Sequence, residues 1–235
     1  MDRRRFITLC TSTLTLIAAN PAVLAQPGAA VKRYARVKLV DRNGQPLKAS
    51  RLAKRACHVF HYPYAGTPCF LIDLGKATAA DMPLDTSGGS HYIWQGGVGP
   101  QKSIVAFSAI CPHQLSYAAK RQSFINYRAD ASPVAGRADV IVCCAHHSIF
   151  DPAQGGKVIG GPAPQPLATI ALEYDAGTDE IYAVGTHGAE LFDDFFTAFK
   201  KELIEDLGRG VARQEVVDKA TVLPIAEYTP DQVLC

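Results

Sequence analysis

The 235-residue sequence has almost no net charge, no internal repeat and no low-complexity tract. Its 24 Lys and Arg residues are offset by 22 Asp and Glu residues, which leaves a formal charge of +2. Because the basic residues are scattered among the acidic ones, nothing predicts a nucleic-acid surface. The missing repeat excludes a solenoid. With 48% hydrophobic and 20% charged residues, we expect a globular chain with one substantial core, or a core and an appendage.

The seven cysteines form no repeating framework, and the C-x-x-C spacing that is typical of zinc sites does not occur. Cys57 and Cys69 are near enough in sequence to close a short loop by a disulfide. We expect instead that they are two buried thiols, which behave as small hydrophobic side chains.

The N-terminus predicts an export signal rather than a part of the fold. Arg3, Arg4 and Phe6 fit the R-R-x-F pattern of a twin-arginine signal, and residues 6–25 are uncharged. We expect a signal peptide over 1–25, cleavage at its end and a periplasmic location. Twin-arginine export carries folded proteins, which suits a chain that acquires a cofactor before export. The alternative is a retained membrane anchor, because about 20 uncharged residues can just span a bilayer.

Short apolar or alternating runs, divided by turns, fill the middle of the chain. Examples are "CFLIDLG", "SIVAFSAI", "ADVIVC", "ATIALEYD" and "EIYAVG", and Asn43-Gly44 marks a hairpin turn before them. Strands at this spacing predict an all-β domain over 34–186.

The period changes in the C-terminal region, 187–235. In "AELFDDFFTAFKKELIEDLG" the apolar residues recur at helical spacing, and Gly208 stands where a C-cap is expected. We predict one amphipathic helix, followed by an extended tail. The apolar face is expected to pack on the β domain or on the chain's own tail; the alternative is a docking surface for a partner subunit.

Two stretches combine cysteine with histidine. "CPH" begins at Cys111, and "CCAHH" begins at Cys143, with 29 residues between the first histidine and the second cysteine. Thiolate and imidazole on opposing turns suit iron or zinc. A structural zinc module is the simplest rival, although one residue between cysteine and histidine is unusual for zinc.

The flanks of these stretches carry a family resemblance. "CPH" followed by "CCAHHSIFDPAQGGKVIGGPAP" resembles the Rieske [2Fe-2S] pattern, which ends in a G-P-A-P loop. The resemblance implies a Rieske-type antiparallel β-sandwich with a small cluster-binding subdomain. It also implies one [2Fe-2S] cluster, with Cys111 and Cys143 on one iron and His113 and His146 on the other.

The second stretch allows two registers, since Cys143 to His146 and Cys144 to His147 both read C-x-x-H. Counting back from "SIFD" at 148–151, the resemblance favours Cys143 and His146 as ligands. Cys144 then takes a position usually held by proline, and His147 one usually held by glycine.

The resemblance also assigns the surroundings of the cluster. Ser148 is expected to donate to a cluster sulfur, and Phe150 lacks the tyrosine hydroxyl of respiratory relatives, which should lower the potential. A proline loop is expected to cover the cluster, with Gly161, Pro162 and Pro164 as its matching residues.

Many high-potential members of this family join their two cluster loops by a disulfide. The matching positions here are Ser116 and Ala145. We therefore expect the loops to be held by packing and hydrogen bonds alone, so that reducing agents leave the visible spectrum and the melting temperature nearly unchanged.

Segments over about 60–186 further resemble the small Rieske subunit of arsenite-oxidase-type periplasmic enzymes. This implies an exported redox subunit, without substrate chemistry of its own, that relays electrons between a molybdenum-containing catalytic subunit and a cytochrome. The alternative is the Rieske subunit of a quinol-oxidising cytochrome bc complex. The interval 114–142 and the tail after Gly188 have no match, so the choice of partner stays open.

Overall fold

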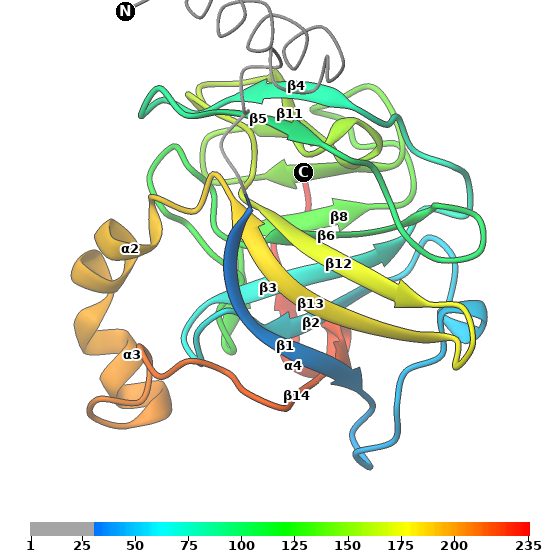
Figure 1. Cartoon of the computed structure of the whole chain (residues 1–235). Helices are drawn as coiled ribbons and strands as arrows, with labels where there is room; N and C mark the ends of the chain where they lie inside the picture. The colour runs from blue at the N-terminus through cyan, green and yellow to red at the C-terminus, as the bar shows by residue number, and fades with distance from the viewer. Residues whose placement is uncertain (1–30) are drawn as a thin grey trace, which may run out of the picture.

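The computed structural model describes residues 31–235, and the predicted signal peptide lies outside them (Figure 1). The elements are β1 (Lys32–Val40), η2 (Ala49–Arg51), β2 (Cys57–His61), β3 (Pro68–Asp73), β4 (Met82–Asp85), β5 (His91–Trp94), β6 (Ile104–Ser108), β7 (Gln122–Ser123), β8 (Ile125–Arg128), β9 (Val140–Cys143), β10 (Ser148–Asp151), η3 (Pro152–Gln154), β11 (Lys157–Gly160), β12 (Thr169–Asp175), β13 (Glu180–His187), α2 (Phe192–Ala198), α3 (Lys200–Leu207), β14 (Lys219–Thr221), β15 (Leu223–Pro224), α4 (Ile225–Tyr228) and β16 (Asp231–Gln232). The expected all-β architecture is confirmed. No helix over 31–235 has the length and apolarity to cross a membrane.

The main sheet has eight strands in the order β14-β1-β13-β12-β6-β3-β2-β15. Only Val222 separates β14 from β15 along the chain, yet these strands occupy opposite ends of the sheet. The two ends must therefore lie beside each other, and the sheet is rolled. The tail supplies both outer strands, so it covers the edges that β1 and β2 would otherwise expose.

Both faces of the main sheet are buried, because its central strands are apolar throughout. In β3, Phe70 and Ile72 join one core while Cys69 and Leu71 join another, as the period of two in a strand requires. The second core takes residues from every strand of the sheet except β15 and fills the inside of the roll. The first core lies on the outer face, against the smaller sheets.

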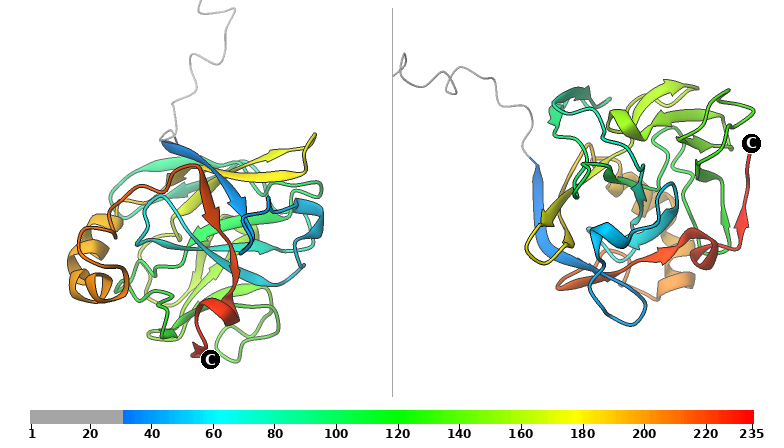
Figure 2. Two further views of the ribbon diagram at one scale, coloured as in Figure 1. Left: turned by 90° about the horizontal axis from the view of Figure 1, so that it is seen from below. Right: turned by 90° about the vertical axis from the view of Figure 1, so that its right-hand side faces the viewer.

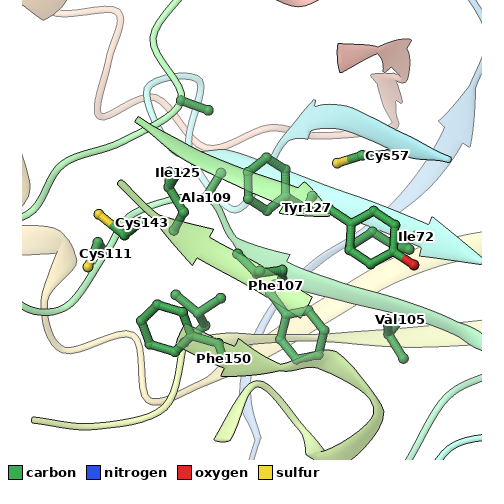
Figure 3. Packing of buried hydrophobic residues seen from close by; sticks show 14 of the residues in the cluster. Cys57, Ile72, Val105, Phe107, Ala109, Cys111, Ile125, Tyr127, Cys143 and Phe150 are labelled. Carbon is green, nitrogen blue, oxygen red and sulfur yellow. The ribbon is translucent and has the colours of Figure 1, made fainter. Parts of the chain in front are cut away.

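The cluster sheet, as we call the four-stranded sheet β11-β10-β9-β8, packs on that outer face. Ile125 and Phe150 of this sheet share the first core with Phe107 of the main sheet (Figure 3). The core ends at a pair of cysteines, so the packing of the two layers places the candidate site.

The C-terminal helical region differs from the predicted single helix. Phe199 leaves helical dihedrals, with φ −106° and ψ 24°, and divides it into α2 and α3. The Phe199 ring packs on Tyr117, with 4.9 Å between ring centroids. Phe192, Phe195 and Leu203 are buried against the β domain, which confirms the expected packing of the apolar face.

Candidate metal centre

The two cysteine-histidine stretches form loops of the same backbone design. The first ligand loop, 111–116, follows β6, and the second ligand loop, 143–148, joins β9 to β10. In each loop the amide four residues after the cysteine donates to the cysteine carbonyl: Leu115 N to Cys111 O at 2.9 Å, and His147 N to Cys143 O at 2.7 Å. Leu115 and His147 also share a left-handed backbone, with φ of 58° and 61°. Both loops are therefore tight turns that bury a cysteine, and their histidines differ in burial: His113 is half-buried and His146 is exposed.

The two cysteines meet at the inner end of the loops. Cys111 and Cys143 are each 1% exposed and are free thiols. The hydrogen bond from Cys111 lowers the pKa of Cys143 to about 7, whereas this bond and burial raise the pKa of Cys111 far above its usual value. The pair thus gives up one proton readily and the second only when a cation compensates the added negative charge.

The two histidines meet at the outer end. The rings of His113 and His146 lie 4.8 Å apart between centroids and are nearly perpendicular, at 84°. His113 Nδ1 is buried and has no hydrogen-bond partner among residues 31–235, which is costly for a polar atom unless a ligand occupies it. His146 is exposed.

Sulfur therefore faces sulfur, and imidazole faces imidazole. Over 31–235 no three His, Cys, Asp or Glu side chains converge on one point, as the ligands of a single ion would. Two thiols beside two imidazoles suit a pair of metal atoms with two protein ligands each. This donor set fits a [2Fe-2S] cluster.

The comparisons with known proteins agree with this geometry. Residues 81–171 match the family model of the Rieske [2Fe-2S] domain, and this range contains all four candidate ligands. The chain is 30% identical over 201 residues to iodate reductase subunit IdrB of Denitromonas iodatirespirans. The aligned region covers 80% of this chain and 82% of that protein. The chain belongs to the Rieske [2Fe-2S] family. As a Rieske protein it carries one [2Fe-2S] cluster and transfers electrons.

Two further relatives were found. Iodate reductase subunit IdrB of Pseudomonas sp. (strain SCT) is 28% identical over 194 residues, covering 80% of each protein. Among solved structures, the soluble domain of Rieske protein II (soxF) from Sulfolobus acidocaldarius is 28% identical, with a TM-score of 0.43, covering 68% of this chain and 81% of that chain.

A disulfide joins Cys144 to Cys235, with 5.8 Å between the Cα atoms. The expectation that packing and hydrogen bonds alone hold the ligand loops is therefore wrong. The bond does not join the two loops, since Ser116 and Ala145 stand at those positions. Instead it joins the second ligand loop to the last residue of the chain, 91 positions away. Connectivity at that separation cannot be deduced from cysteine spacing.

The disulfide also bears on the register of the second stretch. The sulfur of Cys144 is bonded to Cys235, whereas the Cys143 thiol is free and hydrogen-bonds with Cys111. His147 is exposed and its ring lies outside the His113–His146 contact. The arrangement favours Cys143 and His146 over Cys144 and His147.

Cys57 and Cys69 are free and buried, as expected. Burial raises the pKa of both thiols well above the usual value, so neither thiol ionises near neutral pH. They are core residues of the main sheet.

Two serines lie beside the cysteines. The Ser148 hydroxyl is fully buried beside the Cys111 thiol and hydrogen-bonds with it, so it is placed to donate to a cluster sulfur. Ser116 hydrogen-bonds with Cys143, a contact between the two loops that the spacing of the sequence motifs does not predict. Phe150 is fully buried in the same core as both cysteines (Figure 3).

The loop 161–164 touches the second ligand loop through its backbone. Gly161 has a φ of +81°, and Ala163 packs against the core that contains both cysteines. Pro162 and Pro164 are exposed. The predicted covering loop therefore lies where it can shield one side of the candidate site while its prolines face outward.

Proposed function

We propose that the protein is the exported electron-transfer subunit of a larger oxidoreductase, and that Cys111, His113, Cys143 and His146 hold its cluster. One observation carries the proposal: the buried thiols of Cys111 and Cys143 form one pair, and the rings of His113 and His146 form a second pair, in which His146 is exposed. When bound, such a cluster accepts and gives up single electrons at about −150 to +300 mV.

The chain's own residues explain why this site suits electron transfer. The buried thiols supply negative charge to one side, while the imidazoles are neutral ligands, so the added electron is less unfavourable than with four thiolates. Hydroxyl donors such as Ser148 stabilise negative charge on sulfur further. The exposed His146 brings one end of the site within reach of a partner's redox group.

The partner that we propose is a molybdenum-containing catalytic subunit. The relatives named above are subunits of iodate reductase, and the segments over 60–186 resemble the Rieske subunit of arsenite-oxidase-type enzymes. Both comparisons concern enzymes that act on an oxyanion. We propose that electrons pass between such a catalytic subunit and a cytochrome by way of this protein.

The proposed location is the periplasm. The R-R-x-F stretch at Arg3–Phe6 supports twin-arginine export. The Cys144–Cys235 disulfide supports it independently, because disulfides persist in oxidising compartments.

Native purification tests this function. A C-terminal tag would disturb Cys235, so an affinity tag inserted at the exposed Gly177 turn, followed by metal analysis, should recover a large molybdenum-containing subunit with this protein. In that complex, arsenite should bleach the oxidised Rieske absorption, or iodate should restore it after reduction. Recovery with cytochrome b and a response to quinol instead would overturn the proposed partner.

A further inference from the structure

The last segment of the chain connects the two sheets. We call residues 223–235 the strap. It begins with β15, which pairs with β2 at the edge of the main sheet, and continues through α4, whose Ile225 and Tyr228 pack on the first core. It ends with β16, which pairs in parallel with β7 directly before the cluster sheet. In Figure 2 this red segment leaves the main sheet and ends beside the green strands of the cluster sheet.

Asn126, Arg128 and Ser132 bind the end of the strap, and we call these three residues the seat. Asn126 Nδ2 donates to the Val233 carbonyl at 2.9 Å. Ser132 Oγ at 2.6 Å and Arg128 at 2.8 Å donate to the Cys235 carbonyl. Asn126 and Ser132 are each only 1% exposed. Without the strap these buried donors would lose partners, which is costly.

The seat belongs to the interval between the two cysteine-histidine stretches. That interval, 114–142, lies inside the matched Rieske domain, 81–171, whereas the tail after Gly188 lies outside it. The structure brings them together. The interval supplies Asn126, Arg128 and Ser132, and the tail supplies Val233 and Cys235, so the two segments form one contact.

The strap ends in the second ligand loop. Cys235 is bonded to Cys144, the residue that follows Cys143. The Cys144 amide donates to the Phe124 carbonyl at 2.7 Å, next to β7. Gly161 of the covering loop contacts the same ligand loop through its backbone. The loop is thus fixed by the strap and by the covering loop.

We propose that Cys235 is a positioning residue of the electron-transfer site: its bond to Cys144 holds the second ligand loop in place opposite Cys111 and His113. This inference rests on the proposed function, because it takes 143–148 as a ligand loop. Neither Cys144 nor Cys235 is itself a ligand.

The bond is reversible by ordinary thiol chemistry. Closure removes one proton from each thiol and passes two electrons to a disulfide of the protein thiol oxidoreductase class, which becomes a dithiol. Dithiothreitol reverses this step: it returns two thiols and becomes a cyclic disulfide. Reduction of the isolated protein therefore tests the strap without a mutation.

The experiment compares three variants of the cluster-loaded, full-length protein: Cys144→Ser, Cys235→Ser and the double variant. The midpoint potential and the electron paramagnetic resonance (EPR) g values of all three should move away from wild type by the same amount. Proteases should cleave the strap about tenfold faster or more, because its open form is more populated. Treatment of wild type with dithiothreitol should produce the same shifts in potential and g values and the same faster cleavage. The double variant should not respond to dithiothreitol.

Leu234→Ser is the matched control. Leu234 is 56% exposed on the strap, so this variant should keep the disulfide, the potential and the g values of wild type. Thiol alkylation of unfolded, unreduced wild type should label Cys57, Cys69, Cys111 and Cys143 but neither Cys144 nor Cys235.

Two results would overturn the inference: labelling of Cys144 and Cys235, or a wild-type potential and wild-type g values in the double variant and in reduced wild type. In either case a loss of the cluster signal in His146→Ala would leave the proposed function standing. Retention of that signal in His146→Ala would refute the proposed ligands instead. If the serine variants do not assemble a cluster, the test is the potential and the g values of cluster-loaded wild type before and after reduction of the disulfide.

Discussion

Gly161 lies so close to His147 that a Cβ atom at position 161 would stand 2.2 Å from the His147 carbonyl oxygen. It would also stand 2.5 Å from Cα of Ser148. Both contacts are with backbone, which cannot swing aside as a flexible side chain can. The covering loop and the second ligand loop are therefore in contact only because residue 161 has no side chain.

Gly161→Ala should consequently separate these loops. The expected result is faster loss of the cluster absorption at moderate temperature, together with a lower melting temperature. Gly89→Ala is the matched control, because Gly89 has nearly the same φ, +82°, and nothing within 4 Å of its added Cβ. Both variants bear a left-handed backbone penalty of about 1 to 2 kcal/mol. Equal effects of the two substitutions on cluster loss would contradict a role for the close contact.

The ligand assignment predicts different outcomes for two adjacent histidines. His146→Ala should abolish the EPR signal of the reduced protein, because His146 faces His113. His147→Ala should retain the signal, since His147 is exposed and has no part in that contact. The opposite pattern would shift the register of the second stretch by one residue.

The buried Ser148 hydroxyl predicts a change of potential. Ser148→Ala should lower the midpoint potential, because a donor to negatively charged sulfur is lost. A hydrogen bond to a charged group contributes about 1.5 to 3 kcal/mol, which sets an upper limit of about 60 to 130 mV for one electron. Ser108→Ala removes another buried hydroxyl, one without a hydrogen-bond partner among residues 31–235, and should leave the potential near the wild-type value. Phe150→Tyr should change the potential in the opposite direction to Ser148→Ala if its new hydroxyl reaches the cluster.

The features that could be predicted from the sequence are those that a local residue pattern determines, namely the ligand motifs and most strands. Cysteine and histidine spacing, with the flanking "SIFD" and "GPAP" stretches, identified the residues that the structure brings together at the candidate site. Alternation of apolar residues predicted the strands, because a strand buried on one or both faces must follow that pattern.

Contacts between distant segments were not predictable in this way. β14 and β15 are only three and two residues long, and their pairing depends on edges that the rest of the sheet creates. At the break between α2 and α3, the Phe199 ring packs on Tyr117, which lies far away in sequence. Likewise, nothing around Cys144 or Cys235 marks the other as its partner.

A half-buried histidine beside the strap predicts a pH dependence of stability. His61 contacts Tyr228 of α4, with 5.6 Å between ring centroids. Burial lowers the pKa of His61 to about 4 from an ordinary 6.5. Between these values the unfolded chain binds the proton and the folded chain does not, so stability falls as the pH drops from about 6.5 to about 4.

The contribution of His61 is at most roughly 3 kcal/mol, from about 1.4 kcal/mol for each pH unit. His61→Gln should flatten the curve of unfolding free energy against pH in this window, as measured by urea denaturation. His91→Gln is the control: His91 is exposed and pairs with Asp85 at the surface, so its substitution should leave the slope unchanged. A His61→Gln curve as steep as wild type would assign the acid sensitivity to other groups.

Because of the Cys144–Cys235 disulfide, we now expect reducing agents to lower the melting temperature, contrary to the prediction from the sequence. The disulfide closes a loop with a sequence separation of 91, and the chain-entropy relation gives about 4 to 5 kcal/mol for such a loop. Measured values are often smaller, so dithiothreitol should lower the melting temperature by roughly 5 to 10 °C, at about 2 to 4 °C for each kcal/mol. The Cys144→Ser/Cys235→Ser variant should start at this lower temperature and should not respond to dithiothreitol. Because Cys57 and Cys69 are free thiols, a further response of the double variant would mean that a bond other than Cys144–Cys235 stabilises the fold.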